Sequence, residues 1–182
     1  FPTRRSSDLI GLTLSGDVVN MGNITGTTVG VTSTAGNVTN QVGAKIAGST
    51  STTASAAAGT VTNNGTLGTA GTQTNVAGGT VVNNAGGVIN GDVANITGTS
   101  LTNAGNIAGG NVSVNVTGAA TNSGNITAAN NVTVKGGSIS NTGTGNITGS
   151  GNTTLTSAGA VTNDGKIGTA GNTTVTEIGR AH

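Results

Sequence analysis

One short phrase recurs eight times along the chain at a nearly constant interval, and this repetition constrains the fold more than any other feature. Each copy has an apolar residue, a small residue such as Thr, an Asn, a Gly shortly afterwards, and then Ile or Leu. The copies are VVNMGNI (Val18–Ile24), VTNQVGAKI (Val38–Ile46), VTNNGTL (Val61–Leu67), VVNNAGGVI (Val81–Ile89), LTNAGNI (Leu101–Ile107), ATNSGNI (Ala120–Ile126), ISNTGTGNI (Ile139–Ile147) and VTNDGKI (Val161–Ile167). A repeat of this length is typical of a solenoid, in which each copy contributes one coil.

The asparagines of the eight copies are separated by 20, 23, 20, 20, 19, 19 and 22 residues. Three copies, those beginning at Val38, Val81 and Ile139, carry two extra residues, which we interpret as small loop insertions. Stacked asparagines can hydrogen-bond along the axis of a coil stack, and Asn, like Gly, tolerates the left-handed backbone of tight corners. The sequence therefore predicts a structural turn ladder of Asn20, Asn40, Asn63, Asn83, Asn103, Asn122, Asn141 and Asn163.

Strand signals lie between the copies of the phrase. The segment Asn111–Thr117 reads NVSVNVT, and such alternation is typical of a strand with one buried face. Gly, Asn and Thr prevail, and all three are poor helix formers. These observations predict an all-β solenoid of about eight coils of roughly 20 residues. Its thin core should contain the residues that close each phrase, Ile24, Ile46, Leu67, Ile89, Ile107, Ile126, Ile147 and Ile167.

One coil illustrates the expected roles of the positions. Ile107 should point into the core, Asn103 should hold a corner, and Ser113 should face solvent between two inward valines. On this interpretation, we expect the loss of Ile107 to destabilise the coil more than the loss of Asn103, and the loss of Ser113 to matter least.

The two ends differ from the interior. They contain the only Phe, Pro, His and Glu and all three Arg of the chain. RSSDL and EIGRA can be back-translated to GCTCTTCCGATCT and AGATCGGAAGAGC, which are reverse complements and resemble a sequencing adaptor read on both strands. We therefore expect residues 1–9 and 177–182 to be adaptor-derived rather than native, and residues 10–176 to be a solenoid fragment.

The interior has almost no groups that perform chemistry. Its ionisable side chains are three acids and three bases, Asp17, Lys45, Asp92, Lys135, Asp164 and Lys166, and it has no His, Cys, Glu, Arg, Tyr or Trp. Acid–base and nucleophilic catalysis need such groups held close together, so we expect no enzyme, no cofactor and no metal site. The isolated lysines and the lack of aromatics argue against nucleic-acid binding. No apolar run approaches the ~20 residues of a membrane-spanning helix.

The phrase, followed by an alternating strand and a Gly-rich turn, resembles the repeats of filamentous haemagglutinin exoproteins of two-partner secretion. The stretch Leu101–Ala128 shows the resemblance best, and it extends over 10–176. The resemblance implies a right-handed parallel β-helix and export through an outer-membrane transporter to the Gram-negative cell surface or medium. It also implies a shaft that mediates or presents adhesion to a receptor or glycan on host or bacterial cells.

Other functions use similar repeats. Classical autotransporter passengers and the shafts of contact-dependent toxins differ mainly in their flanking domains. An ice-binding solenoid is hinted at by Thr pairs such as Thr153–Thr154, although no Thr-x-Thr recurs at a fixed position of the phrase. A carbohydrate-active β-helix would need a carboxylate cluster, whereas Asp17 and Asp92 are 75 residues apart.

Overall fold

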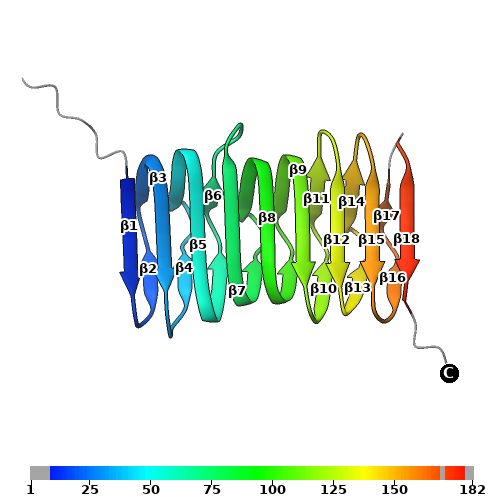
Figure 1. Cartoon of the computed structure of the whole chain (residues 1–182), viewed down its shortest axis with the longest axis horizontal. Helices are drawn as coiled ribbons and strands as arrows, with labels where there is room; N and C mark the ends of the chain where they lie inside the picture. The colour runs from blue at the N-terminus through cyan, green and yellow to red at the C-terminus, as the bar shows by residue number, and fades with distance from the viewer. Residues whose placement is uncertain (1–8, 169–170, 179–182) are drawn as a thin grey trace, which may run out of the picture.

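The structure, a computed structural model, describes residues 9–168 and 171–178, which form β-strands and no helix (Figure 1). The strands follow one another around a stack of coils, and some run through a corner from one face to the next. They are β1 (Leu9–Leu14), β2 (Val18–Asn20), β3 (Asn23–Ser33), β4 (Val38–Asn40), β5 (Lys45–Asn63), β6 (Thr66–Gly68), β7 (Gln73–Asn83), β8 (Val88–Asn103), β9 (Asn106–Val116), β10 (Ala119–Asn122), β11 (Asn125–Ala128), β12 (Val132–Gly136), β13 (Ser138–Asn141), β14 (Asn146–Gly149), β15 (Thr153–Ser157), β16 (Val161–Asn163), β17 (Lys166–Ile167) and β18 (Thr173–Glu177).

Each coil has three faces, which together enclose the core. The asparagine face contains the segment that ends in the repeated Asn, the isoleucine face contains the residue that closes the phrase, and the long face contains the alternating strand. In Figure 1 the strands at the front run downward, and the chain returns upward behind them while it advances from left to right. The coils are therefore right-handed, as parallel crossover connections almost always are. The predicted right-handed parallel solenoid is confirmed.

Neighbouring coils pair in parallel with matching residues side by side. On the asparagine face Asn20 pairs with Asn40, and on the isoleucine face Ile24 pairs with Ile46. On the long face Val114 pairs with Ile96 before it and Val134 after it. Parallel strands lie about 4.8 Å apart, so eight coils rise about 38 Å.

The predicted loop insertions are β-turns at the corner between the asparagine and isoleucine faces. In each, a backbone N–H donates to the carbonyl three residues earlier, from Ala44 to Gln41 (3.0 Å), Gly87 to Asn84 (2.8 Å) and Gly145 to Thr142 (2.6 Å). Gly43 and Gly86 have φ values of 76° and 84°, a backbone that favours glycine. The strands after these turns keep their pairing, so the extra residues leave the coil stack unchanged.

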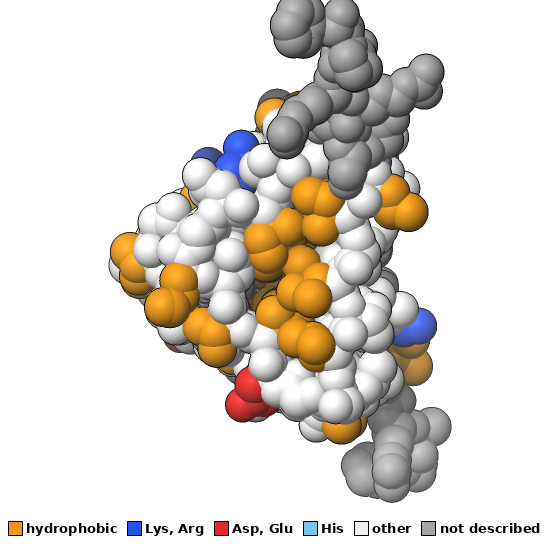
Figure 2. All heavy atoms as spheres, turned by 90° about the vertical axis from the view of Figure 1, so that its left-hand side faces the viewer, with side chains coloured by type: hydrophobic (Ala, Val, Ile, Leu, Met, Phe, Trp, Pro, Cys, Tyr) orange, Lys and Arg blue, Asp and Glu red, His pale blue; other side chains and the backbone are white. Residues whose placement is uncertain are grey.

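The core is a set of aliphatic columns that run along the axis. The long face contributes inward positions such as Val29 and Val31 in one coil and Val112 and Val114 in another, all at most 2% exposed. Small polar residues also enter the core at the corners, where they are hydrogen-bonded; the Thr52 hydroxyl, for example, accepts from the Gly48 N–H (2.8 Å). Seen along the axis, the N-terminal end of the stack has a triangular outline with hydrophobic side chains across its centre (Figure 2).

Two expectations differ from the structure. The asparagines do not use the left-handed backbone, because no non-glycine residue in the described part of the chain has a positive φ. Leu9 and Glu177, predicted to lie outside the solenoid, pair with Thr28 and Ser157. The N–H of Ile178, also predicted to lie outside, donates to the Ser157 carbonyl (2.7 Å), because backbone hydrogen bonding continues past each predicted boundary whatever the side chain. Residues 1–8 and 179–182 lie outside the described residues, and the adaptor origin of the ends stays a prediction.

Candidate functional site: the asparagine ladder and the outer faces

The eight repeated asparagines form one continuous chain of hydrogen bonds inside the solenoid. In each case the Nδ2 group donates to the Oδ1 atom of the asparagine in the next coil towards the C-terminus. The seven distances are 2.8 Å (Asn20–Asn40), 2.9 Å (Asn40–Asn63), 2.8 Å (Asn63–Asn83), 2.8 Å (Asn83–Asn103), 2.7 Å (Asn103–Asn122), 2.8 Å (Asn122–Asn141) and 2.7 Å (Asn141–Asn163). All the bonds point the same way, so the ladder has a direction.

Each amide also lies against the backbone of the neighbouring corner. Asn103 Nδ2 is 3.3 Å from the carbonyl oxygen of Gly105 in its own coil and 3.0 Å from that of Asn125 in the next coil. The same arrangement occurs at Asn83, with Gly87 and Asn106 as the partners. The side chain therefore joins two coils and also supports the corner that follows it.

Burial divides the ladder into a dry interior and two unequal ends. The six central asparagines are at most 2% exposed, and Asn20 in the first coil is 6% exposed. Asn163 in the last coil is exposed. Asn163 accepts from Asn141, whereas its own Nδ2 donates to Gly165 of its own corner (3.2 Å). The predicted corner role of the asparagines is thus carried by buried side chains rather than by an unusual backbone.

The predicted core residues form a second column on the neighbouring face. Ile46, Leu67, Ile89, Ile107, Ile126 and Ile147 are at most 1% exposed. Ile24 and Ile167 are only partly buried, because they lie in the first and last coils and have a neighbouring coil on one side only. Ser113 is on the outside of the long face, between Asn95 and Thr133.

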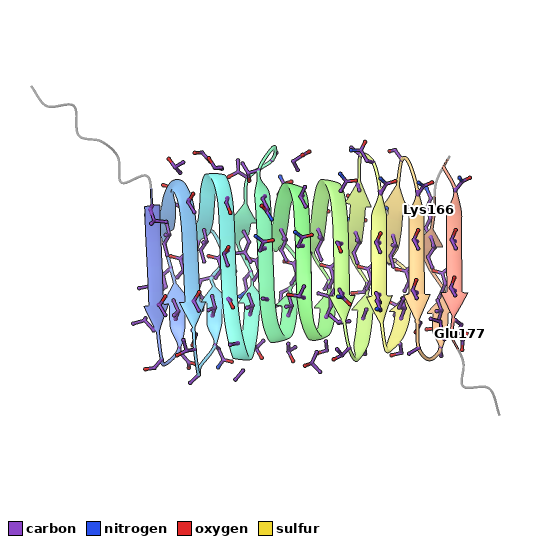
Figure 3. All side chains as sticks on the ribbon, viewed as in Figure 1. Lys166 and Glu177 are labelled. Carbon is purple, nitrogen blue, oxygen red and sulfur yellow. The ribbon has the colours of Figure 1, made fainter. Side chains whose placement is uncertain are left out.

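The charged residues of the described chain are dispersed around the stack. Lys166 lies on β17 at the back and Glu177 at the end of β18 at the front (Figure 3). Asp17 precedes β2, where its Oδ1 accepts from the backbone N–H of Asn37 (2.7 Å), whereas Asp92 lies within β8. The described residues contain no group of three or more His, Cys, Asp or Glu that could hold a metal ion.

The outer side of the asparagine face carries a column of small, mostly hydroxylated residues. The second position of each phrase lies here, and the column reads Val19, Thr39, Thr62, Val82, Thr102, Thr121, Ser140 and Thr162. The Thr162 hydroxyl donates to that of Ser140 (3.1 Å). The sequence signal for this column is the residue before each repeated Asn, whose shared outward orientation was not predicted.

A shallow hollow of about 400 Å³ lies at the corner that follows the long face in three successive coils. It is lined by Asn115, Val116, Thr117, Lys135, Gly136, Gly137 and Ala158, so Lys135 is its one charged residue. The described residues form no helix, and hence none that could cross a membrane.

Comparison with protein-family models, with curated proteins and with solved structures gives no match.

Proposed function

We propose that the chain is a segment of the shaft of a large secreted bacterial surface adhesin, in which it holds a binding region away from the cell. The observation that supports this most directly is the unbroken pairing of all three faces from coil to coil, with the asparagine ladder inside. A stack of this kind is a stiff, quasi-one-dimensional rod in which each coil contacts only its neighbours. The outer faces are short of charge, and the described residues contain no group of three or more His, Cys, Asp or Glu, which suits a spacer.

The resemblance to filamentous haemagglutinin repeats supplies the biological setting of the proposal. It suggests an outer-membrane transporter as the partner during secretion and a receptor or glycan on host or bacterial cells as the partner in adhesion. Display on a Gram-negative surface follows from the same resemblance. Autotransporter passengers and contact-dependent toxins would use such a shaft in the same mechanical role, with different flanking domains.

Removal of one coil tests the shaft role. Deletion of residues 104–122 removes one repeat and leaves Asn103 followed by Ser123–Gly124, as Asn122 is in the intact chain. The intact and shortened chains are each placed between an outer-membrane anchor and a binding domain of known target on a bacterial surface. A shaft should keep the binding domain displayed and active after loss of a coil. The matched control deletes residues 109–118, half a coil, and should abolish folding and display.

If the full-coil deletion abolishes display as completely as the half-coil deletion, the coils are not interchangeable units and the shaft proposal is wrong. A second assay locates adhesion itself: beads coated with the purified chain are offered to epithelial and bacterial cells. Saturable attachment, competed by soluble chain, would make this segment adhesive in its own right. Display without attachment would make it a presenting segment.

The hydroxyl column on the asparagine face favours one alternative, an ice-binding solenoid. Thr60 and Thr62 lie side by side with Thr80 and Val82 and then with Ser100 and Thr102, so hydroxyl groups occupy many outward positions of this face. Val19 and Val82 interrupt the column, which makes this the weaker proposal. Inhibition of ice recrystallisation by the purified chain, lost on Thr102→Lys, would favour it over the shaft.

A further inference from the structure

The aliphatic columns determine which face of each strand is buried. They do not determine the register, that is, which residue of one coil pairs with which residue of the next. Inward residues alternate with outward ones, so a slip of one residue would turn the buried side chains to solvent. A slip of two residues would not. On the long face, a two-residue slip of β9 would place Val112 opposite Ile96 instead of Ala94, which is again an apolar contact.

Chain connectivity does not define the register either, because the corners accept chains of different length. Successive asparagines are 19 to 23 residues apart, yet the paired strands match. Ala56 and Thr60 of β5 pair with Gly78 and Thr80 of β7, so one coil holds two more residues than the next at the corner before the asparagine face. The extra residues thus form a bulge at the corner and leave the paired strands in register.

The asparagine column is the element that distinguishes one register from another. Among the described residues, it is the one inward position filled by the same polar residue in all eight coils. A two-residue slip of β7 would place the Asn83 amide between Val61 and Leu101, away from Asn63 and Asn103. A buried amide without partners is costly, whereas the aliphatic residues would be nearly indifferent. We propose that the ladder sets the register of the coils, each Asn holding its strand in the one alignment that continues the hydrogen-bond chain.

The coil that contains Asn83 offers a direct test, because its sequence can satisfy two registers. Asn83 is followed by Asn84, Ala85, Gly86 and Gly87 before Val88. If residue 85 were the ladder residue, Gly86–Gly87 would span the corner, as Ala104–Gly105 does in the next coil. The two residues gained at the preceding corner have a precedent in Ala57–Gly59. The double variant Asn83→Val/Ala85→Asn therefore moves the amide by two positions and leaves the coil able to follow it.

Cysteine pairs report which register is adopted, since the chain has no cysteine of its own. Thr62 pairs with Val82 in the native alignment, so Thr62→Cys/Val82→Cys reports the native register. Thr62→Cys/Asn84→Cys reports the slipped one. Directly paired residues are about 5 Å apart and a two-residue offset about 8 Å, whereas a disulfide needs Cα atoms closer than about 7 Å. Disulfide yield after mild oxidation is measured by non-reducing peptide mapping.

In the native background we expect the 62–82 disulfide. In the Asn83→Val/Ala85→Asn background the 62–84 disulfide should exceed it by about tenfold or more, because an unsatisfied buried amide shifts an equilibrium by that much. The control is Asn83→Val alone, which removes the amide without offering another, so neither alignment is selected and both disulfides should form. Retention of 62–82 in the double variant, loss of both disulfides, or exclusive formation of 62–82 in Asn83→Val alone would each overturn the proposal.

Discussion

The asparagine column and the isoleucine column lie on adjacent faces of the same coils, are equally buried in the interior, and are chemically opposite. Along the isoleucine column Leu67 replaces Ile without any change in burial or pairing. Along the asparagine column no substitution occurs in eight coils. A buried aliphatic position requires only that its space be filled, so it tolerates substitution by a residue of similar size. A buried carboxamide must find donors and acceptors in fixed places, so one column tolerates variation and the other demands identity.

The largest effect should follow from a change of charge within the ladder. In Asn103→Asp the carboxylate keeps the Asn83 donor, but it places oxygen against the Asn122 Oδ1 and the Asn125 carbonyl, which accepted from Nδ2. Burial and the lost donor raise the pKa of the introduced carboxyl group above its unfolded value. The folded state then binds the extra proton, so stability is greatest below the unfolded pKa and falls as the pH rises towards the folded pKa.

Denaturant unfolding of Asn103→Asp at about pH 3.5 and about pH 7 measures this, since an Asp side chain in the unfolded chain titrates near pH 3.9. The matched control is Ser113→Asp on the outer side of the long face, where solvent keeps the pKa ordinary. Equal pH dependence in the two variants would contradict the ladder as described.

Truncation of the same residue should cost slightly less. Asn103→Ala removes one acceptor from Asn83 Nδ2, which keeps the Gly87 and Asn106 carbonyls, and leaves Asn122 Oδ1 without its donor. The unsatisfied oxygen costs about 1–3 kcal/mol and the lost hydrogen bond about 1 kcal/mol, so the free energy of unfolding should fall by about 2–4 kcal/mol. Urea unfolding followed by circular dichroism is the measurement. A loss below about 1 kcal/mol, the net value of an ordinary hydrogen bond, would mean that water replaces the missing amide.

On the isoleucine column we expect size to decide the outcome. Ile107→Ala leaves a cavity between Ile89 and Ile126 and should lower the free energy of unfolding by about 2–5 kcal/mol. Ile107→Val, the graded control, should lower it by about 0.5–1.5 kcal/mol. If the Val variant is as unstable as the Ala variant, this column is as exacting as the asparagines and the contrast between them fails.

The end of the ladder should be far more tolerant than its middle. Asn163 is exposed and accepts from Asn141 without donating to another ladder residue. In Asn163→Asp a carboxylate can still accept from Asn141 Nδ2, so stability at neutral pH should change by less than about 1 kcal/mol. Asn20→Asp is the informative partner, because Asn20 must donate to Asn40. If the two end variants are equally damaging, the ladder has no direction.

The smallest effect on stability is expected for a substitution on the outer surface of the long face. Ser113 faces outward between Asn95 and Thr133, so Ser113→Ala should stay within about 0.5 kcal/mol, as surface substitutions usually do. Thermal unfolding beside the intact chain is sufficient to measure it. A loss comparable to that of Ile107→Ala would show that the inward and outward faces of β9 are exchanged.

The repeat made the architecture predictable, because a 20-residue period rich in Val, Ile and Thr leaves few folds other than a β-solenoid. The relative contributions of the residues within a coil to stability were harder to predict from the sequence. The sequence suggested that Asn103 holds a corner through its backbone and its side-chain hydrogen bonds, and that it matters less than Ile107. Because Asn103 is fully buried and hydrogen-bonded to two other amides, we expect its loss to cost about as much as the loss of Ile107. Asn is common both in corners and in buried ladders, and only the inward orientation of a strand's last residue separates the two. The outward hydroxyl column was likewise not predictable, because its members become neighbours only through the register between coils.

Because of the turns at Gln41–Ala44, Asn84–Gly87 and Thr142–Gly145, the length of the solenoid along its axis does not follow from the number of residues in the chain. Because extra residues leave the stack at a corner, the rise depends on the number of coils alone. A gene for such a rod can therefore acquire or lose a few codons at these corners without altering the reach of the product. Whole repeats change reach in steps of one strand spacing. Surface decoration and length can thus evolve separately, the former by small insertions and the latter by duplication.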